Sequence, residues 1–363
     1  MKTKGLVRAA VFAIASALGS FCGASEAISF DTTEQMIASE AEPSLMDYVT
    51  NDGLSGGRWY AGSEMTMLNV KATTGGIISM SFSDTTAPGV ATASVRNTGI
   101  DNLTYSPRFW IGREINDCWA VQTRFWQLNS TKLEPSPANP AIPNTGSNFA
   151  TIDDLDSVKF YTLDVEAVRR FTPGAWKVDG TFGARHASFD SNAASTAFGV
   201  FTTGNFINVR LSNGSSFDGT GVTSAVLGRR ALGDSCVSLF VGGRGSHMWG
   251  RTDSFARSVG TVASSPSAPL VGAATVTRAN AEGTMDIIEM QIGLQWDLEM
   301  RCIPANAFFR AGFEGQYWKL TGRPTGGAGF GGTIGEITTN SFASADLGEA
   351  RLVGGVLGVG LNW

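Results

Sequence analysis

The stretch MDIIEMQIGLQWDLEMRCIPANAFFRAGFEGQYWKL, Met285–Leu320, holds the pattern that decides the fold. Apolar and polar side chains alternate along Ile288–Leu298, and after a turn around Arg301–Pro304 they alternate again along Phe309–Tyr317. A period of two is typical of β-strands that have one apolar and one polar face. Both runs approach the roughly nine to eleven residues that a tilted strand needs to cross a bilayer. The stretch therefore predicts two strands of a transmembrane β-barrel, with lipid outside and a polar lumen inside.

The composition of the whole chain excludes several classes of protein. Among its 363 residues are 45 glycines, and only 16% of the residues are charged. Abundant glycine with little charge argues against both a disordered and a helical protein. A net charge of −5 gives no electrostatic reason to expect nucleic acid as a partner.

The first 27 residues have the features of a secretory signal peptide. Lys2, Lys4 and Arg8 precede the short apolar run Ala9–Leu18, and small residues allow cleavage after Ala27 or, as a second choice, after Ala24. We expect residues 28–56 to be a polar, acidic periplasmic lead and residues 57–363 to be the barrel. No later segment has eighteen continuous apolar residues, so membrane insertion would require a closed barrel.

Ten strand candidates follow the lead, and the connections between them alternate between tight and long. This alternation is typical of outer-membrane barrels, whose periplasmic turns are short and whose external loops are long. Additional strands at Ile77–Ser83 with Ala91–Val95, or at Asn205–Leu211, would raise the count to twelve. The ten candidates are Arg58–Val70, Thr104–Ile115, Trp119–Thr131, Val158–Phe171, Trp176–Asp190, Gly219–Ala231, Val237–Gly250, Met285–Leu298, Phe308–Trp318 and Glu349–Trp363.

Several stretches, taken in order, resemble a known family, the pore-forming outer-membrane proteins known from Legionella and expanded in planctomycetes. The resemblance spans about Gly57 to Trp363 and implies an outer-membrane location and pore formation. It supplies no catalytic residues. The matching stretches are RWYAGSEMTML, SPRFWIGREINDCWAVQTRFW, LDVEAVRRFTPGAWKVDGTFGARHASFD, GVTSAVLGRRALG, LFVGGRGSHMWG, EMQIGLQWDL and FFRAGFEGQYW.

Strand parity places equal numbers of acidic and basic side chains in the lumen. If the barrel is open, they would line a narrow channel of weak ion selectivity; if it is filled, they would pair across strands. The small inward glycines favour the open channel. The expected lumen residues are the acids Glu64, Asp164, Glu166, Asp179, Glu289, Asp297 and Glu314, and the bases Arg108, Arg124, Arg170, Lys177, Arg185, Arg244 and Arg310.

Four tryptophans lie next to short turns or at the last residue, and we expect them to form one aromatic belt at the periplasmic interface. They are Trp119, Trp176, Trp296 and Trp363.

Three cysteines follow the signal peptide, and all lie at short turns. Cys236 opens one strand and Cys302 follows its neighbour, so these two ends approach each other. Neighbouring strands lie about 4.8 Å apart, which a disulfide can span. We expect a Cys236–Cys302 bridge with Cys118 free.

The sequence offers little for catalysis or metal binding. The only histidines, His186 and His247, point outward by parity, whereas an acid–base pair would need an imidazole in the lumen or in a loop cleft. No Cys/His cluster has metal-ligand spacing. We therefore expect neither enzymatic activity, nor a metal, nor a cofactor.

The combined pattern predicts an outer-membrane porin-like protein that forms a narrow, weakly selective channel for small solutes. Two alternatives stay open, namely a structural or adhesive barrel without an open pore, and a secreted soluble β-protein that binds glycans. The expected partners are outer-membrane lipid, the barrel-assembly machinery and small solutes, with homo-oligomerisation left open and nucleic acid not expected.

Overall fold

The computed structural model describes residues 58–363, with gaps at 73–76, 85–89, 97–99, 137–146, 202–205, 264–270, 301–304, 322–326, 335–336 and 345–347. The chain divides into two compact units, residues 1–53 and 54–363, and the description below concerns the second. The expected signal peptide and periplasmic lead lie outside the described residues.

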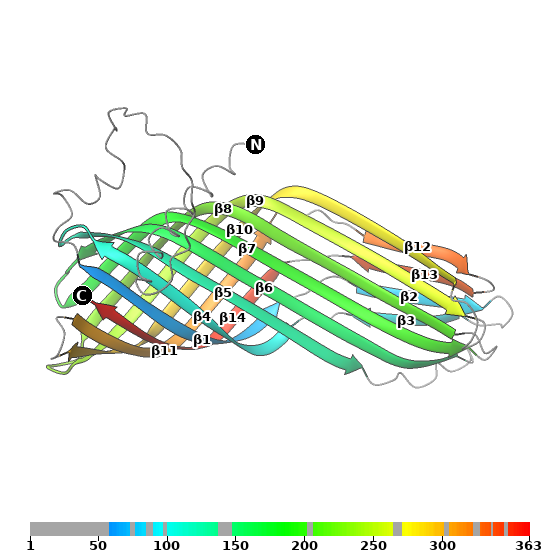
Figure 1. Cartoon of the computed structure of the whole chain (residues 1–363), viewed down its shortest axis with the longest axis horizontal. Helices are drawn as coiled ribbons and strands as arrows, with labels where there is room; N and C mark the ends of the chain where they lie inside the picture. Colours follow the sequence, from blue (N-terminus) through cyan, green and yellow to red (C-terminus); the bar gives the residue numbers. More distant parts are fainter. Residues whose placement is uncertain are drawn as a thin grey trace, which may run out of the picture. The chain divides into compact units, whose positions relative to one another are not determined.

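Ten antiparallel strands close into a barrel, which confirms the predicted up-and-down topology (Figure 1). Each barrel strand pairs with the barrel strands before and after it in the chain, and β1 pairs with β14 to close the barrel. The strands are β1 (Trp59–Ala72), β4 (Ile100–Glu114), β5 (Trp119–Ser136), β6 (Ser147–Phe171), β7 (Trp176–Phe201), β8 (Phe206–Ala231), β9 (Val237–Ala263), β10 (Val271–Met300), β11 (Ala305–Thr321) and β14 (Glu349–Asn362).

Four further strands form a separate sheet in the order β12-β13-β2-β3. The β2–β3 hairpin lies between β1 and β4 in the chain, and the β12–β13 hairpin lies between β11 and β14. The two hairpins join where β2 pairs with β13. Strands β12 and β13 also contact β9 of the barrel. The two strands suggested near Ile77 and Ala91 therefore exist but do not enlarge the barrel to twelve. Their bounds are β2 (Ile77–Asp84), β3 (Val90–Arg96), β12 (Gly327–Ile334) and β13 (Ile337–Ser344).

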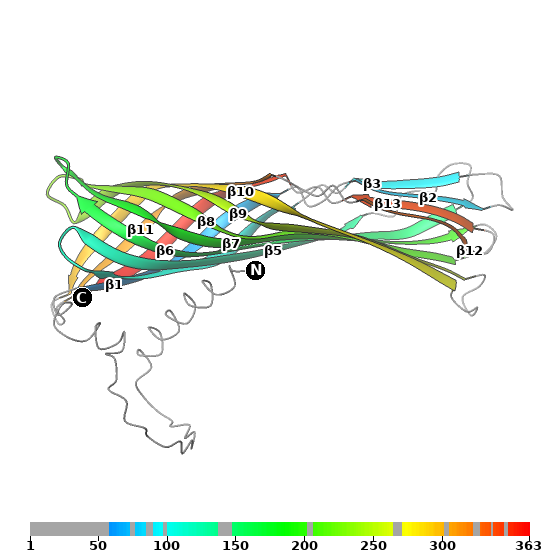
Figure 2. The same cartoon turned by 90° about the horizontal axis from the view of Figure 1, so that it is seen from above.

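The strands β6–β10 are 25 to 30 residues long, far more than one membrane crossing requires (Figure 2). Val271–Gly283 of β10 pairs with β9 but has no partner on β11, because the pairing with β11 begins at Thr284. We call this part of β10, together with the segments of β7–β9 aligned with it, the extension. Three of the long connections between the strand candidates, Lys132–Asp156, Ser191–Ser216 and Arg251–Ala281, were expected to be loops, but much of each is strand. Continuous pairing with neighbouring strands stabilises these segments although their composition is typical of loops.

The outer face of the barrel carries an apolar band. On β10, Ile288, Met290 and Ile292 are exposed, and the next outward residue beyond them is Asp286. In the described residues, no helix is long and apolar enough to cross a membrane.

The short connections lie at one end of the barrel, which we call the turn end. Between β4 and β5, Asn116 Oδ1 accepts hydrogen bonds from the backbone N–H groups of Cys118 and Trp119, at 3.0 and 2.9 Å, as in an Asx-turn. Gly174 and Gly233 have φ of 61° and 64° in the turns after β6 and β8, where glycine adopts the left-handed conformation without steric cost. These tight turns keep consecutive strands adjacent and hold the lumen side chains in register.

Candidate functional site in the barrel lumen

Five arginines and five carboxylates form a buried layer across the lumen, which we call the charged layer. All ten were expected to point inward, and the structure brings them together in ion pairs. They come from eight of the ten barrel strands, so the layer connects most of the barrel wall across the lumen. Its members are Glu64, Arg108, Arg124, Asp164, Glu166, Arg185, Arg244, Glu289, Arg310 and Glu314.

One half of the charged layer is centred on Arg108, which is only 1% exposed. Its guanidinium donates to Glu64 at 2.9 Å and to the two carboxylate oxygens of Glu314 at 2.8 and 2.5 Å. Arg310 lies 2.6 Å from the second Glu64 oxygen. Gln291 and Gln316 also donate to Glu314, at 2.6 and 2.5 Å. Glu314 therefore accepts hydrogen bonds from three side chains, whereas Glu64 accepts one from Arg108 and forms an ion pair with Arg310.

The other half is centred on Arg185, which binds Asp164 through two nitrogens at 2.6 and 2.8 Å and Glu289 at 2.7 Å. Arg124 contacts the second Glu289 oxygen at 3.1 Å. Arg244 pairs with Glu166 and lies 3.4 Å from Asp164. Burial of an isolated ion costs several kcal/mol, and complete pairing with equal numbers of each charge offsets this cost. The layer is therefore built as a neutral network and not as a set of hydrated charges.

Beyond the charged layer, away from the turn end, buried apolar side chains fill the lumen, and we call them the apolar layer. Its rings pack closely: the Phe160 centroid lies 5.0 Å from Trp318 and 4.7 Å from Phe189, and Trp126 lies 6.0 Å from Trp318. Aromatic pairs of this kind each contribute about 0.5–1.5 kcal/mol beyond their buried area. The layer also includes Leu68, Val70, Leu128, Val158, Phe217, Met248, Met285, Ile287, Leu320 and Leu352.

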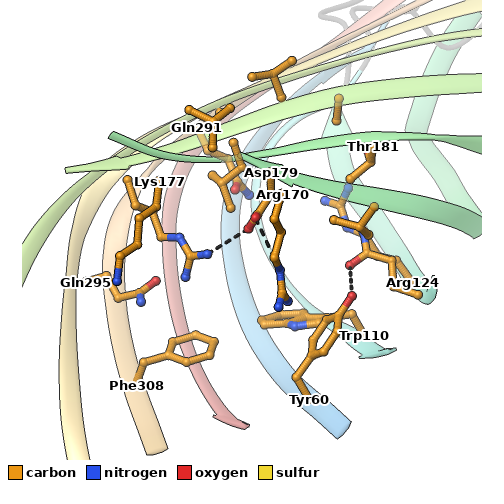
Figure 3. A pocket seen from close by; sticks show the side chains of 18 of the residues that line it. Tyr60, Trp110, Arg124, Arg170, Lys177, Asp179, Thr181, Gln291, Gln295 and Phe308 are labelled. Atoms are coloured by element: carbon orange, nitrogen blue, oxygen red, sulfur yellow. Dashed lines mark hydrogen bonds and ion pairs between the residues drawn. The ribbon is translucent and has the colours of Figure 1, made fainter. Parts of the chain in front are cut away.

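On the turn side of the charged layer lies a cavity of about 480 Å³, which we call the vestibule (Figure 3). Arg58, Asp117 and Asn362 line it near the turn end, and charged-layer residues such as Glu289 form its inner limit. Arg310 stacks on the Trp110 ring there, 4.5 Å from the centroid. Ligand pockets have similar volumes, so the vestibule has room for a small solute.

Three more of the expected lumen residues line the vestibule. Asp179 pairs with Arg229 at 2.8 Å and with Arg170 at 3.6 Å, while Arg170 also pairs with Glu114. Lys177 lines the same cavity and is exposed.

Asp297 differs from the other predicted lumen residues, because it is exposed near the turn end and does not line the vestibule. It accepts a hydrogen bond from Gln295 at 2.7 Å. An inward-facing residue near the end of a strand lies at the rim of the lumen, whereas one in the middle of the strand lies inside it. Both have the same parity, so parity alone does not distinguish the two positions.

Sequence reasoning missed the apolar layer, although a signal for it existed. Trp126 follows Arg124 by two residues, and Trp318 follows Gln316 by two, so both rings share the parity of the lumen charges. An aromatic residue on the polar face of a membrane strand is a mark of a filled lumen.

The two histidines lie on the outer face of the barrel. His247 Nδ1 is 2.6 Å from an Asp286 oxygen, and its ring packs edge-on against Trp249. His186 lies 3.7 Å from an Asp218 oxygen and contacts the Tyr161 ring. Within the described ranges, no group of three His, Cys, Asp or Glu side chains could hold a metal ion.

The four belt tryptophans all lie near the turn end. Trp119 stacks under Arg169, and Trp296 packs against Phe309 with centroids 5.6 Å apart. Trp363 exchanges two backbone hydrogen bonds with Trp59, each 2.9 Å long, where β14 meets β1. Trp176 begins β7 directly after a short turn.

The described cysteines, Cys118 and Cys236, are exposed free thiols at the turn end. Cys236 lies beside the end of β10, because its carbonyl oxygen accepts a hydrogen bond from the Asp297 backbone at 2.9 Å. Cys302 lies outside the described residues, so its bridge to Cys236 stays a prediction.

No protein-family model matches this chain, and no curated protein matches it. The resemblance to the Legionella and planctomycete family therefore stays an expectation. The chain is similar to the solved structure of the outer membrane protease OmpT from Escherichia coli, with 8% identity and a TM-score of 0.36 over 84% of this chain and 96% of that one.

Two further solved structures are similar to this chain. The attachment invasion locus protein Ail of Yersinia pestis matches with 10% identity and a TM-score of 0.22, over 84% of this chain and 98% of that one. A FadL homologue of Pseudomonas aeruginosa matches with 7% identity and a TM-score of 0.27, over 85% and 90%. The fold assignment rests on the closed strand order of the chain itself.

Proposed function

We propose that this protein is an outer-membrane barrel that holds the extension at the cell surface and keeps its lumen closed. The observation that carries the proposal is the double layer across the lumen. Paired charges and packed rings occupy the space that a channel would need, and a ten-stranded barrel is narrow enough for side chains to fill. The proposal thus favours the scaffold over the open channel suggested by the inward glycines.

The second candidate is the narrow channel for small solutes. The vestibule favours it, since this cavity extends from the turn end to the charged layer. Conduction would then require the charged and apolar layers to separate, which would break several buried ion pairs at once. A channel of this kind would be gated and closed at rest.

Single-channel recording in planar bilayers distinguishes the two functions. We expect no conductance steps from the wild-type protein. A variant with Trp126→Ala, Trp318→Ala and Arg185→Ala, which removes parts of both layers, should conduct if it still inserts. Stable steps from the wild-type protein would overturn the closed scaffold and favour the channel.

The orientation is tested in intact cells with a membrane-impermeant maleimide. Asn280→Cys introduces a thiol on the outward face of the extension and should react in intact cells. The native thiol Cys118 at the turn end is the matched control and should react only after the outer membrane is permeabilised. Labelling in the reverse order would contradict the proposed orientation.

A further inference from the structure

The outward face of the extension carries three exposed arginines, Arg210 on β8, Arg257 on β9 and Arg278 on β10, which we call the arginine row. Arg257 lies opposite Ser212 on one side and Val276 on the other, so Arg210 and Arg278 are both its diagonal neighbours. Diagonal neighbours in a sheet are about 7–8 Å apart. Three consecutive strands thus present one cation each in a continuous line.

No described side chain pairs with the arginine row. The nearby acid on the same face, Asp253, is held by Arg251 at 3.2 Å. Like charges that face each other across strands are destabilising. Three unpaired arginines in a line therefore favour an external polyanion as their counter-charge.

The position of the row excludes membrane lipid as that polyanion. On β10, eight residues separate Arg278 from Asp286, the first outward polar residue beyond the apolar band. At about 3.3 Å per residue, this is roughly 26 Å along the strand, which corresponds to about 18–21 Å along the membrane normal at the usual strand tilt of about 35–45°. Lipid head groups at the edge of the band do not reach so far, whereas a chain polymer extending from the cell surface does.

The neighbours of the row fit a polymer that is rich in hydroxyl groups. Asn208 and Asn280 are exposed on the same face and offer amide donors and acceptors. We infer that the outward face of the extension binds an anionic polysaccharide, with each arginine contacting a sulfate or phosphate group. This inference rests on the proposed surface placement of the extension, but binding by the purified protein tests the row independently of that placement.

The experiment measures binding of fluorescent dextran sulfate to the purified full-length protein in detergent, with neutral dextran as the ligand control. The test variant carries R210Q, R257Q and R278Q. The matched control carries R251Q and D253N, which removes an ion pair from β9 without freeing a carboxylate beside the row. We expect at least a tenfold loss of affinity for the triple variant and less than a twofold loss for R251Q/D253N. The slope of log Kd against log salt should fall by about two, because each polyanion contact contributes roughly 0.7.

Heat-modifiable mobility in gels confirms that both variants are folded, and circular dichroism checks their strand content. Unchanged affinity in a folded triple variant would overturn the inference. Equal binding of poly-glutamate would overturn the polysaccharide assignment and favour an acidic protein partner. If the protein bound inorganic phosphate but not dextran sulfate, the row would be a site for single anions, and the polysaccharide inference would also be overturned.

Discussion

Replacing Arg108 by methionine tests whether the lumen charges are buried in pairs or hydrated in a pore. Methionine has a similar length but no charge, so the substitution removes the guanidinium with little change of volume. The charged layer would then hold five carboxylates against four arginines. The expected cost is that of an uncompensated buried charge, about 3–5 kcal/mol.

The structure narrows that range. Glu64 keeps its contact with Arg310 at 2.6 Å, and Glu314 keeps its two glutamine donors. We therefore expect a loss near the lower limit, about 3 kcal/mol of the free energy of unfolding. The double variant R108M/E314Q restores equal numbers of charges and should recover more than half of that loss.

The assay is equilibrium unfolding in urea, followed by tryptophan fluorescence in lipid vesicles. Lys71→Met is the matched control, because Lys71 and Asp101 form an ion pair 3.4 Å long whose side chains are 64% and 55% exposed. Such a surface pair contributes about 0–1 kcal/mol. If R108M costs no more than K71M, the lumen charges are hydrated and the reasoning behind the closed barrel fails.

Three further predictions follow from the packing. Trp126→Ala should lower the free energy of unfolding by about 3–5 kcal/mol, because it leaves a cavity in the apolar layer, and urea unfolding measures the loss. Gly354→Ala should reduce the heat-modifiable fraction on gels, since a Cβ there meets a backbone carbonyl of β1, whereas Gly315→Ala, with open space around its Cβ position, should not. Deleting residues 361–363 should impair membrane insertion, measured by protease resistance in vesicles, because it removes the hydrogen bonds between Trp363 and Trp59; full resistance would contradict this role.

The sequence predicted the barrel because lipid and lumen are very different environments. Along Ile288–Leu298 each outward position is apolar and each inward position is polar or small, so the period of two is easily recognised. The same contrast predicted the ten staves and the inward direction of Glu64, Arg108 and Glu314.

The extension was not predicted, because that contrast is missing there. Ser191, Ser215 and Ser254 are buried on its inward face, while the outward face is also polar. With polar residues on both faces, no period of two appears, and the composition is typical of loops. Only the pairing with neighbouring strands, which a single sequence does not show, reveals these segments as strands.

The ion-pair partners within the charged layer could also not be predicted from the sequence. Arg108 and Glu314 are 206 positions apart, and their contact depends on the tilt and stagger of all the strands between them. Parity gives the direction of a side chain but not its height in the lumen. The ion-pair network across the lumen could therefore be seen only in the three-dimensional register.

The pairing of β1 with β14 has a consequence for biogenesis. These strands lie almost 300 positions apart in the chain, yet each completes the hydrogen bonding of the other. Pairing between strands so far apart in the chain has a large entropic cost and forms slowly during folding. Until it forms, both strands expose unpaired backbone groups that can pair with other chains. The unpaired edge of β1 thus makes the polypeptide prone to aggregation until β14 is available to cover it.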